Sequence, residues 1–195
     1  MSPFALFDQR PLLVAIAGPN GAGKTTFYHA HLEDCGLRFV NADVLARELS
    51  MEPYAAASMA DALRRELVRQ NESFIFETVF SDPENARIEF LKKAAASGYV
   101  VVLCYIGLAN AGISDERVAM RVSQGGHDVP REKIQTRFPR SLANLQTAIR
   151  ELPHVVVYDN SDLRRPYKRV AVFHGGRTQY RSKSVPDWFR MPSEN

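Results

Sequence analysis

The chain has 195 residues, of which 45% are hydrophobic, and a formal net charge of +3 at pH 7. This size predicts one domain, 1–195, with a buried core, and so mild a charge identifies no partner by itself. The apolar runs, such as 99–106, are too short to cross a membrane, and two cysteines provide neither a disulfide framework nor metal-ligand spacing. Because residues 1–11 also lack the features of a signal peptide, we expect a cytoplasmic protein.

Short apolar runs alternate with helical segments along the chain. The runs are continuous, as in strands that are buried on both faces of a parallel sheet. The pattern predicts an α/β three-layer sandwich with a mostly parallel central sheet, whose ligands bind at the carboxyl ends of the strands. We expect strands at 12–17, 38–40, 73–76, 99–106, 154–158 and 169–173, and helices near 25–34, 42–49, 53–71, 82–97, 114–124 and 131–151.

A glycine-rich motif, GPNGAGKTT, follows the first predicted strand and matches the pattern G-x-x-x-x-G-K-[ST] of phosphate-binding loops (P-loops). Its backbone N–H groups and the start of the next helix can surround one anion, Lys24 can reach the β- and γ-phosphates, and Thr25 can ligate Mg²⁺. A glycine-rich turn that binds nothing is the alternative, but a strand and a helix in register favour phosphate binding. The motif therefore predicts ATP and Mg²⁺ as cofactors, bound by Gly18, Asn20, Gly21, Ala22, Gly23, Lys24, Thr25 and Thr26.

Two carboxylates follow the second and third predicted strands, at the sheet edge where the P-loop lies. Asp43 is placed to accept the proton of an acceptor hydroxyl, although an N-cap of a helix at 44–49 is the alternative role. Glu77 closes a buried apolar run, which is costly unless the carboxylate is paired or binds something. We therefore expect Asp43, Glu77 and Thr78 to hold the substrate.

The helix predicted at 82–97 carries local signals at both ends. Ser81 to Glu84 resembles a capping box at its start, and Gly98 stands where a C-terminal capping glycine belongs. In the strand that follows, Cys104 is expected to be buried and inert.

The segment 114–144 predicts two arginine-bearing helices that form a lid over the triphosphate. Arg117 and Arg121 lie four residues apart on the first helix, and Arg137 and Arg140 share a face of the second with Asn144. We predict that these arginines stabilise charge on the transferred phosphoryl group, with Arg121 and Arg137 catalytic and Arg140 bound to the nucleotide. A solvated arginine face on an ordinary helical hairpin is the alternative.

Other features of the same segment concern its shape. The second helix has an apolar stripe from Ile134 to Ile149, and Pro139 should kink it. The connecting loop, QGGHDVP, is expected to be flexible, and its His127 has no second ligand in metal-binding spacing.

The C-terminal part predicts a β-hairpin, about 168–183, that turns at Gly175 and Gly176. Residues 161–195 hold eight Lys and Arg against three Asp and Glu, which forms either a solvated basic face or a surface for an anionic partner. The aromatic residues Tyr180, Trp188 and Phe189 are interpreted as packing residues, and no basic-aromatic stacking motif supports nucleic-acid binding.

These pieces together resemble the zeta-toxin-like P-loop kinases, in particular their short stand-alone bacterial branch. The resemblance runs from about Leu12 to Ser161, and it rests on IAGPNGAGKTTF, FVNAD, FIFETVFS, GYVVVLCYIGL, RVAMRVSQGGHDVP, RFPRSLANL and VYDNS. It implies ATP-dependent phosphorylation of a small molecule, which in zeta toxins is a UDP-activated amino sugar, and an antitoxin protein as a partner. It also implies that Asp43 is the general base, that Glu77 binds the substrate, and that Arg121 with Arg137 or Arg140 grips the γ-phosphate. The chain departs from the founding toxins in being shorter and in having ETVF where they have a glycine-containing motif.

Three alternatives stay open at this point. A P-loop ATPase without an acceptor is one, although an ABC ATPase would need an LSGGQ-like signature and a strand ending in Asp-Glu, and neither occurs. A nucleotide-dependent regulatory module is the second. The third is a kinase of another small acceptor, such as an antibiotic or a nucleoside, which the sequence does not separate from a sugar-nucleotide kinase.

Overall fold

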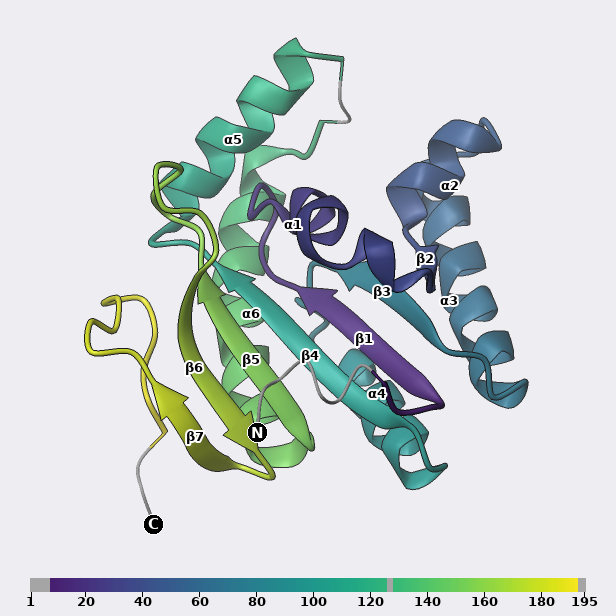
Figure 1. Cartoon of the computed structure of the whole chain (residues 1–195). Helices are drawn as coiled ribbons and strands as arrows, with labels where there is room; N and C mark the ends of the chain where they lie inside the picture. Colours follow the sequence, from purple (N-terminus) through teal and green to yellow (C-terminus); the bar gives the residue numbers. More distant parts are fainter. Residues whose placement is uncertain (1–7, 126–127, 193–195) are drawn as a thin grey trace.

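The computed structural model describes residues 8–125 and 128–192, and its centre is a seven-stranded sheet (Figure 1). The strand order is β2-β3-β1-β4-β5-β6-β7, in which the first five strands run parallel and the last two pair antiparallel. This arrangement confirms the predicted α/β class and the C-terminal hairpin. The strands are β1 (Leu12–Ala17), β2 (Arg38–Val40), β3 (Phe74–Thr78), β4 (Val100–Gly107), β5 (His154–Asp159), β6 (Lys168–His174) and β7 (Arg177–Arg181).

Helices pack on both faces of the sheet, so that the sheet separates two hydrophobic cores. Side chains of α1 meet β1, β4 and β5 in one core, while α3, α4 and α6 contribute to the other (Figure 1). β1 is fully buried, as its uninterrupted apolar run predicts. The helices are α1 (Lys24–His31), the 3₁₀ turn η2 (Glu33–Cys35), α2 (Ala42–Glu48), α3 (Pro53–Arg69), α4 (Ala86–Ala96), α5 (Ala111–Ser123) and α6 (Arg131–Glu151). Over the described ranges, no helix is both long and apolar enough to cross a membrane.

The start of α4 differs from the prediction, whereas its end agrees. The helix begins at Ala86 and not at 82, so the expected capping box is wrong. Residues 79–85 form a loop, and the side chain of Asp82 accepts a hydrogen bond from the backbone N–H of Arg87, in the first turn of α4, at 3.3 Å. At the other end, Gly98 has φ +95°, and the N–H groups of Gly98 and Tyr99 bond back to the last turn in a Schellman motif.

The helix α6 has two parts with different surroundings. Its C-terminal half belongs to the core through Leu145, Ala148 and Ile149, as the apolar stripe predicts. Its N-terminal half is buried at Ile134 and Phe138 and begins beside α5, where Arg131 pairs with Asp115 at 3.2 Å. This half and α5 are the parts that the predicted lid would contain. Pro139 is inside this continuous helix. Gly126 and His127 of the connecting loop lie outside the described residues, so the predicted flexible loop and the interpretation of His127 stay predictions.

The chain after β7 returns to the carboxyl ends of the strands. The hairpin turns at Gly175 and Gly176, both with positive φ, as a two-residue hairpin turn requires. Trp188 occupies the space beside Gly107, where an added Cβ would lie 2.0 Å from the indole, and Phe189 is buried. Tyr180, by contrast, is 39% exposed, and its ring packs against the guanidinium of Arg169 at the surface and not in the core.

Candidate functional site

The P-loop, between β1 and α1, has a backbone that only glycine can adopt at two positions. Gly18 has φ +145°, and an added Cβ would lie 2.1 Å from the carbonyl oxygen of Ile106. Gly23 has φ +84°, and its added Cβ would lie 2.8 Å from the side-chain amide of Asn160. The loop is therefore fixed against β4 and the segment after β5, with the first turn of α1 directly behind it, as an anion site at a helix N-terminus requires.

Lys24, the first residue of α1, is only 5% exposed. Its Nζ donates to the carbonyl oxygen of Pro19 at 3.0 Å and lies 3.8 Å from Oε1 of Glu77. Burial lowers the pKa of Lys24, and the charges of Glu77 and Asp43 act in the opposite direction. The ammonium is thus held over the loop, where a phosphate would be a further counter-charge.

Glu77, at the carboxyl end of β3, is tied to the P-loop more closely than the sequence indicates. Its Oε2 accepts hydrogen bonds from Thr25 Oγ1 at 2.7 Å and from Asn41 Nδ2 at 2.9 Å. The other end of the Asn41 amide caps α2, because Oδ1 accepts from the N–H groups of Asp43 and Val44. Asn41 is therefore the N-cap, and the capping role considered for Asp43 is wrong.

The donor set around Thr25 fits a Mg²⁺ ion. A threonine hydroxyl and a carboxylate oxygen are hard ligands of the kind that Mg²⁺ prefers, and Thr25 and Glu77 bring them together beside the P-loop. Within the described ranges there is no group of three or more Asp, Glu, His or Cys that could hold a metal without further ligands. A Mg²⁺ ion here would depend on ATP phosphates and water for its remaining ligands, as is usual for this ion.

Asp43 and Arg121 face each other across the opening of the site. Asp43 Oδ2 lies 4.0 Å from Arg121 NH1, and their side chains are 65% and 41% exposed. Both charges act on the Lys24 ammonium, which places them near the P-loop lysine. A surface pair of this length contributes little stability, so these side chains can exchange partners when ligands bind.

Arg117 does not belong with the arginines expected to contact phosphate. Its NH2 donates to the backbone oxygens of Asn160 and Ser161, at 2.8 and 3.1 Å, which fastens α5 to the segment after β5. Asn160 in turn donates from Nδ2 to the carbonyl oxygen of Ala22 at 2.8 Å, and Tyr167 donates its hydroxyl to that of Gly23 at 3.0 Å. Ser114 adds a third bond from its hydroxyl to the carbonyl of Asn20. Side chains from α5 and the β5–β6 connection thus hold the P-loop from outside.

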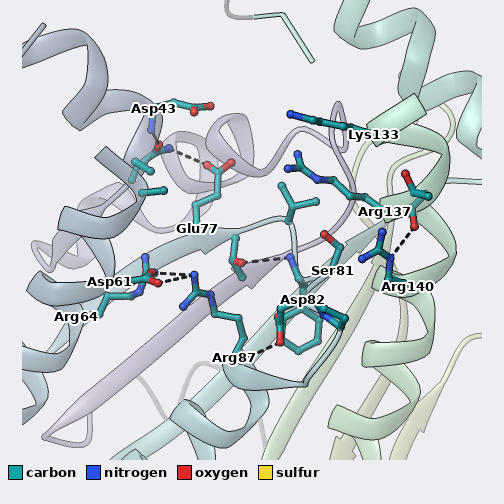
Figure 2. A pocket seen from close by; sticks show the side chains of 18 residues that line it. Asp43, Asp61, Arg64, Glu77, Ser81, Asp82, Arg87, Lys133, Arg137 and Arg140 are labelled. Carbon is teal, nitrogen blue, oxygen red and sulfur yellow. Dashed lines mark hydrogen bonds and ion pairs between the residues drawn. The ribbon is translucent and has the colours of Figure 1, made fainter. Parts of the chain in front are cut away.

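A cavity of about 590 Å³ opens beside the two carboxylates that lie near the P-loop, Asp43 of α2 and Glu77 of β3 (Figure 2). Asp43 and Glu77 lie on one wall of this cavity, and α6 provides the opposite wall; we call it the acceptor cavity after the role that is proposed for it below. Thr78 lines it too, and Thr78 Oγ1 accepts from the N–H of Phe80 at 3.2 Å. Most remaining positions come from α3 and the loop after β3, and the set comprises Asn41, Ala42, Ala57, Asp61, Arg64, Val79, Phe80, Ser81, Asp82, Pro83, Arg87, Lys133, Thr136, Arg137 and Arg140.

The cavity floor carries a charge cluster that joins α3 to α4. Asp61 pairs with Arg64 one turn along α3 and with Arg87 of α4, whose NH2 lies 2.8 and 3.0 Å from the two carboxylate oxygens. Arg64 is 4% exposed, and its guanidinium lies 4.9 Å from the centre of the Phe76 ring. Burial, with Arg87 adding to it, lowers the pKa of Arg64 to about 9, so the group still carries its charge at neutral pH.

Arg137 and Arg140 line the cavity, whereas Asn144, one turn farther along α6, does not. Asn144 is 7% exposed, and its amide donates to the carbonyl oxygens of Phe80 and Asp82 at 3.2 and 2.9 Å. By helical spacing Asn144 shares the face of Arg137 and Arg140, as expected, but its buried side chain holds the loop after β3 and is not available to a phosphate.

The predicted site residues thus separate into groups. The P-loop residues Gly18 to Thr26, with Glu77, Asp43 and Arg121, come together at one sheet edge. Reasoning from sequence assigned no role to Asn41, Asn160 and Tyr167, although Asn41 directly follows one predicted strand and Asn160 lies two residues after another, and their position was a usable signal. It also missed Asp61, Arg64 and Arg87, for which only the helical spacing of Asp61 and Arg64 was a hint.

Comparisons with known proteins identify the family of the chain. Residues 13–138, more than half of the chain, match a family model described as an AAA domain. An uncharacterized protein of Haemophilus influenzae is 28% identical over 127 residues, which are 62% of this chain and 88% of that protein.

Several solved structures share the fold at low sequence identity. A chain of the AvrRxo1-ORF1:-ORF2 complex with ATP superposes with a TM-score of 0.69 at 19% identity over 87% of this chain, which spans 60% of that chain. A chain of the PezAT toxin-antitoxin system of Streptococcus pneumoniae gives 0.58 at 13% identity, covering 92% of this chain and 76% of the other. Shikimate kinase from Acinetobacter baumannii, in complex with shikimate, gives 0.51 at 18% identity, covering 82% and 89%. These likenesses show the α/β P-loop fold, and the family match shows that the chain belongs to the AAA domain family.

Proposed function

We propose that the protein is an ATP-dependent kinase that transfers the γ-phosphate to a hydroxyl group of a small molecule in the acceptor cavity. The observation that carries this proposal is the cavity itself, which opens beside the P-loop and has Asp43 and Glu77 on its wall (Figure 2). An ATPase needs only a water at the γ-phosphate, whereas a cavity of about 590 Å³ is of the size that binds small ligands.

The chain's own groups have distinct roles in this proposal. The P-loop N–H groups and Lys24 bind the β- and γ-phosphates, and Asp43 accepts the proton of the acceptor hydroxyl as its oxygen bonds to the γ-phosphorus. The bond between that phosphorus and the bridging oxygen to the β-phosphate breaks, and ADP leaves with the electron pair. Arg121, near both Asp43 and Lys24, is positioned to stabilise charge on the transferred group. Thr25 and Glu77 would hold Mg²⁺, which neutralises phosphate charge when it is bound.

The role of Glu77 in this scheme differs from the substrate-binding role that the family resemblance implies. Its two hydrogen bonds and its proximity to Lys24 all point to the nucleotide side of the site. Glu77 would therefore place Thr25 and the ion, while Asp43, which is 65% exposed and faces the cavity, meets the acceptor.

A UDP-activated amino sugar is the acceptor that we propose to test first. The resemblance of the sequence motifs to zeta-toxin-like kinases supports it. Two structures that share the fold support an antitoxin-like protein as a partner, since PezAT is a toxin-antitoxin system and AvrRxo1-ORF1 was crystallised with ORF2.

The decisive experiment compares Asp43→Asn with wild type in ATP binding and in transfer of labelled phosphate to a panel of hydroxyl acceptors that includes UDP-N-acetylglucosamine. The amide keeps the shape of the side chain but loses its basicity, so transfer should fall about 10²–10⁴-fold while ATP affinity stays within a few-fold. Asp34→Asn, an exposed carboxylate outside the cavity, is the matched control and should change neither. Full transfer by Asp43→Asn would exclude the base role, and phosphate release at one rate with and without every acceptor would favour an ATPase.

A further inference from the structure

The α6 wall of the acceptor cavity carries three cationic side chains, Lys133, Arg137 and Arg140, here called the α6 cation row. We propose that this row binds an anionic group of the acceptor, a phosphate ester or a carboxylate, and thereby directs its hydroxyl toward Asp43. The inference rests on the proposed kinase function and reassigns Arg137 and Arg140 from the γ-phosphate to the acceptor.

The acids of the cavity are already engaged elsewhere. Asp61 is shared by Arg64 and Arg87, and Asp82 accepts from the backbone of Arg87. Glu77 is occupied by Thr25, Asn41 and the nearby ammonium of Lys24. Among the cavity acids, none forms an ion pair with the α6 cation row in the described part of the chain.

The contacts of the row itself are to neutral groups. Lys133 Nζ donates to the Tyr54 hydroxyl at 2.8 Å, and Arg140 Nε donates to the carbonyl oxygen of Thr136 at 3.1 Å. For Arg137, the residues that the structure describes provide no hydrogen bond and no ion pair. An acceptor without charge would leave this excess of positive charge uncompensated, whereas an anion would gain charge-assisted hydrogen bonds from a fork-shaped guanidinium.

The geometry of the row suits a group that extends along α6. Positions 133, 137 and 140 lie on one helix face and span roughly 10 Å along the axis, since an α-helix rises about 1.5 Å per residue. Lys133 and Arg137 extend from α6 toward Glu77 across the cavity (Figure 2). An anion on this wall would therefore face the side on which Asp43 lies, with the body of the acceptor between them.

The nucleotide, by contrast, has cations of its own. Lys24 is buried in the P-loop, and Arg121 is near enough for its charge to lower the pKa of Lys24 and to face Asp43 at 4.0 Å. These two residues provide positive charge at the β- and γ-phosphates without help from α6. The row and the P-loop cations thus form two separate anion sites, one for each substrate.

Equilibrium binding can test the row without any phosphoryl transfer. Calorimetry with saturating nonhydrolysable ATP analogue and Mg²⁺ would compare three anionic probes, UDP-N-acetylglucosamine, N-acetylglucosamine 1-phosphate and glucuronate, with neutral N-acetylglucosamine. We expect at least one anionic probe to bind at least 10-fold more tightly than the neutral sugar, and the phosphate and carboxylate probes show which anion the site takes. Arg137→Ala should weaken that probe about 10- to 100-fold, the usual worth of hydrogen bonds to charged groups, and Arg140→Ala should also weaken it.

The controls separate this inference from a structural effect and from the kinase proposal. Arg137→Ala should keep the wild-type affinity for the ATP analogue, which also shows that it folds, and Arg150→Ala, on α6 but outside the cavity, should change neither ligand. Three results would each overturn the inference. The neutral and anionic probes bind equally well, no anionic probe binds, or Arg137→Ala loses affinity for the ATP analogue alone. If anion binding depends on Arg137 but no phosphoryl transfer occurs, the anion site is supported and the kinase proposal is rejected. Efficient transfer to the neutral sugar would support the kinase proposal and reject the anion site.

Discussion

Replacing Glu77 with Gln should destabilise the free protein through Lys24. The glutamine oxygen can still accept from Thr25 and Asn41, but an amide NH₂ then faces the ammonium that Oε1 approaches at 3.8 Å. At that distance, and with an effective dielectric constant of about 20, the lost attraction is about 4 kcal/mol. Because Lys24 keeps its bond to the Pro19 carbonyl and the charge of Asp43 remains nearby, we expect a net loss of about 2–3 kcal/mol at pH 7.

The loss of folding stability in Glu77→Gln should depend on pH, and the titration of Lys24 sets its direction. Burial holds the pKa of Lys24 below its ordinary value of 10.5, so the unfolded chain binds more protons than the folded one between those two values. Wild-type stability therefore gains from this group as pH rises through the folded pKa toward 10.5. Without Glu77 the pKa falls further, and the deficit of Glu77→Gln relative to wild type should shrink toward pH 10, where a neutral amine needs no counter-charge.

Urea unfolding followed by circular dichroism at pH 7 and pH 10 measures both effects. Glu66→Gln is the matched control, because Glu66 forms an ion pair with Arg69 on the exposed surface of α3 and its loss should leave the midpoint unchanged. A second measurement, ATP affinity with and without Mg²⁺, should show a smaller gain from the ion in Glu77→Gln if Glu77 and Thr25 hold it. Unchanged stability at pH 7, or a deficit of equal size at both pH values, would refute the coupling of Glu77 to Lys24.

Three further substitutions test other parts of the site. Arg121→Ala should lower kcat far more than it raises KM for ATP in steady-state kinetics, because its contact strengthens in the transition state, and Arg121→Lys should rescue poorly. Gly18→Ala should abolish ATP binding and lower the melting temperature, because its methyl group would lie 2.1 Å from the carbonyl oxygen of Ile106. Asn41→Ala should cost about 1 kcal/mol in urea unfolding through the lost cap of α2, and it should also weaken ATP binding by releasing Glu77.

The fold could be predicted largely because its signals are local. Continuous apolar runs gave the five parallel strands and β6, and two consecutive glycines located the hairpin turn. The prediction of where α4 starts was wrong because a contact that is distant in the sequence decides it. Ser81 to Glu84 has the local pattern of a cap, but Asn144, more than 60 residues away, holds the carbonyls of Phe80 and Asp82 and keeps the segment out of the helix.

In the candidate site, too, the residues with a local sequence signal could be predicted and those that depend on tertiary packing could not. The P-loop and the carboxylates after β2 and β3 could be predicted, because parallel strands end at one edge and the motif is contiguous. The Asp61 cluster could not, because Arg87 joins Asp61 only when α3 and α4 pack against β3. Lys133 was not predicted as a site residue, because it lines the cavity only through the face that α6 turns toward it. No local sequence pattern determines which face that is.

The two halves of the site are held in physically different ways. Asn160 and Tyr167 bond to the backbone of the P-loop, and Arg117 bonds to the backbone of Asn160. These buried or half-buried bonds constrain the P-loop whatever the acceptor is. The acceptor half depends on side chains that project from α2 and α6, together with a loop that Asn144 anchors. Side chains on a fixed frame can change without disturbing that frame, so acceptor choice can diverge while the ATP half stays the same. A shared fold at 13–19% identity shows the arrangement of the frame and names no acceptor, so the charges of the acceptor cavity are the better guide to the acceptor that we propose.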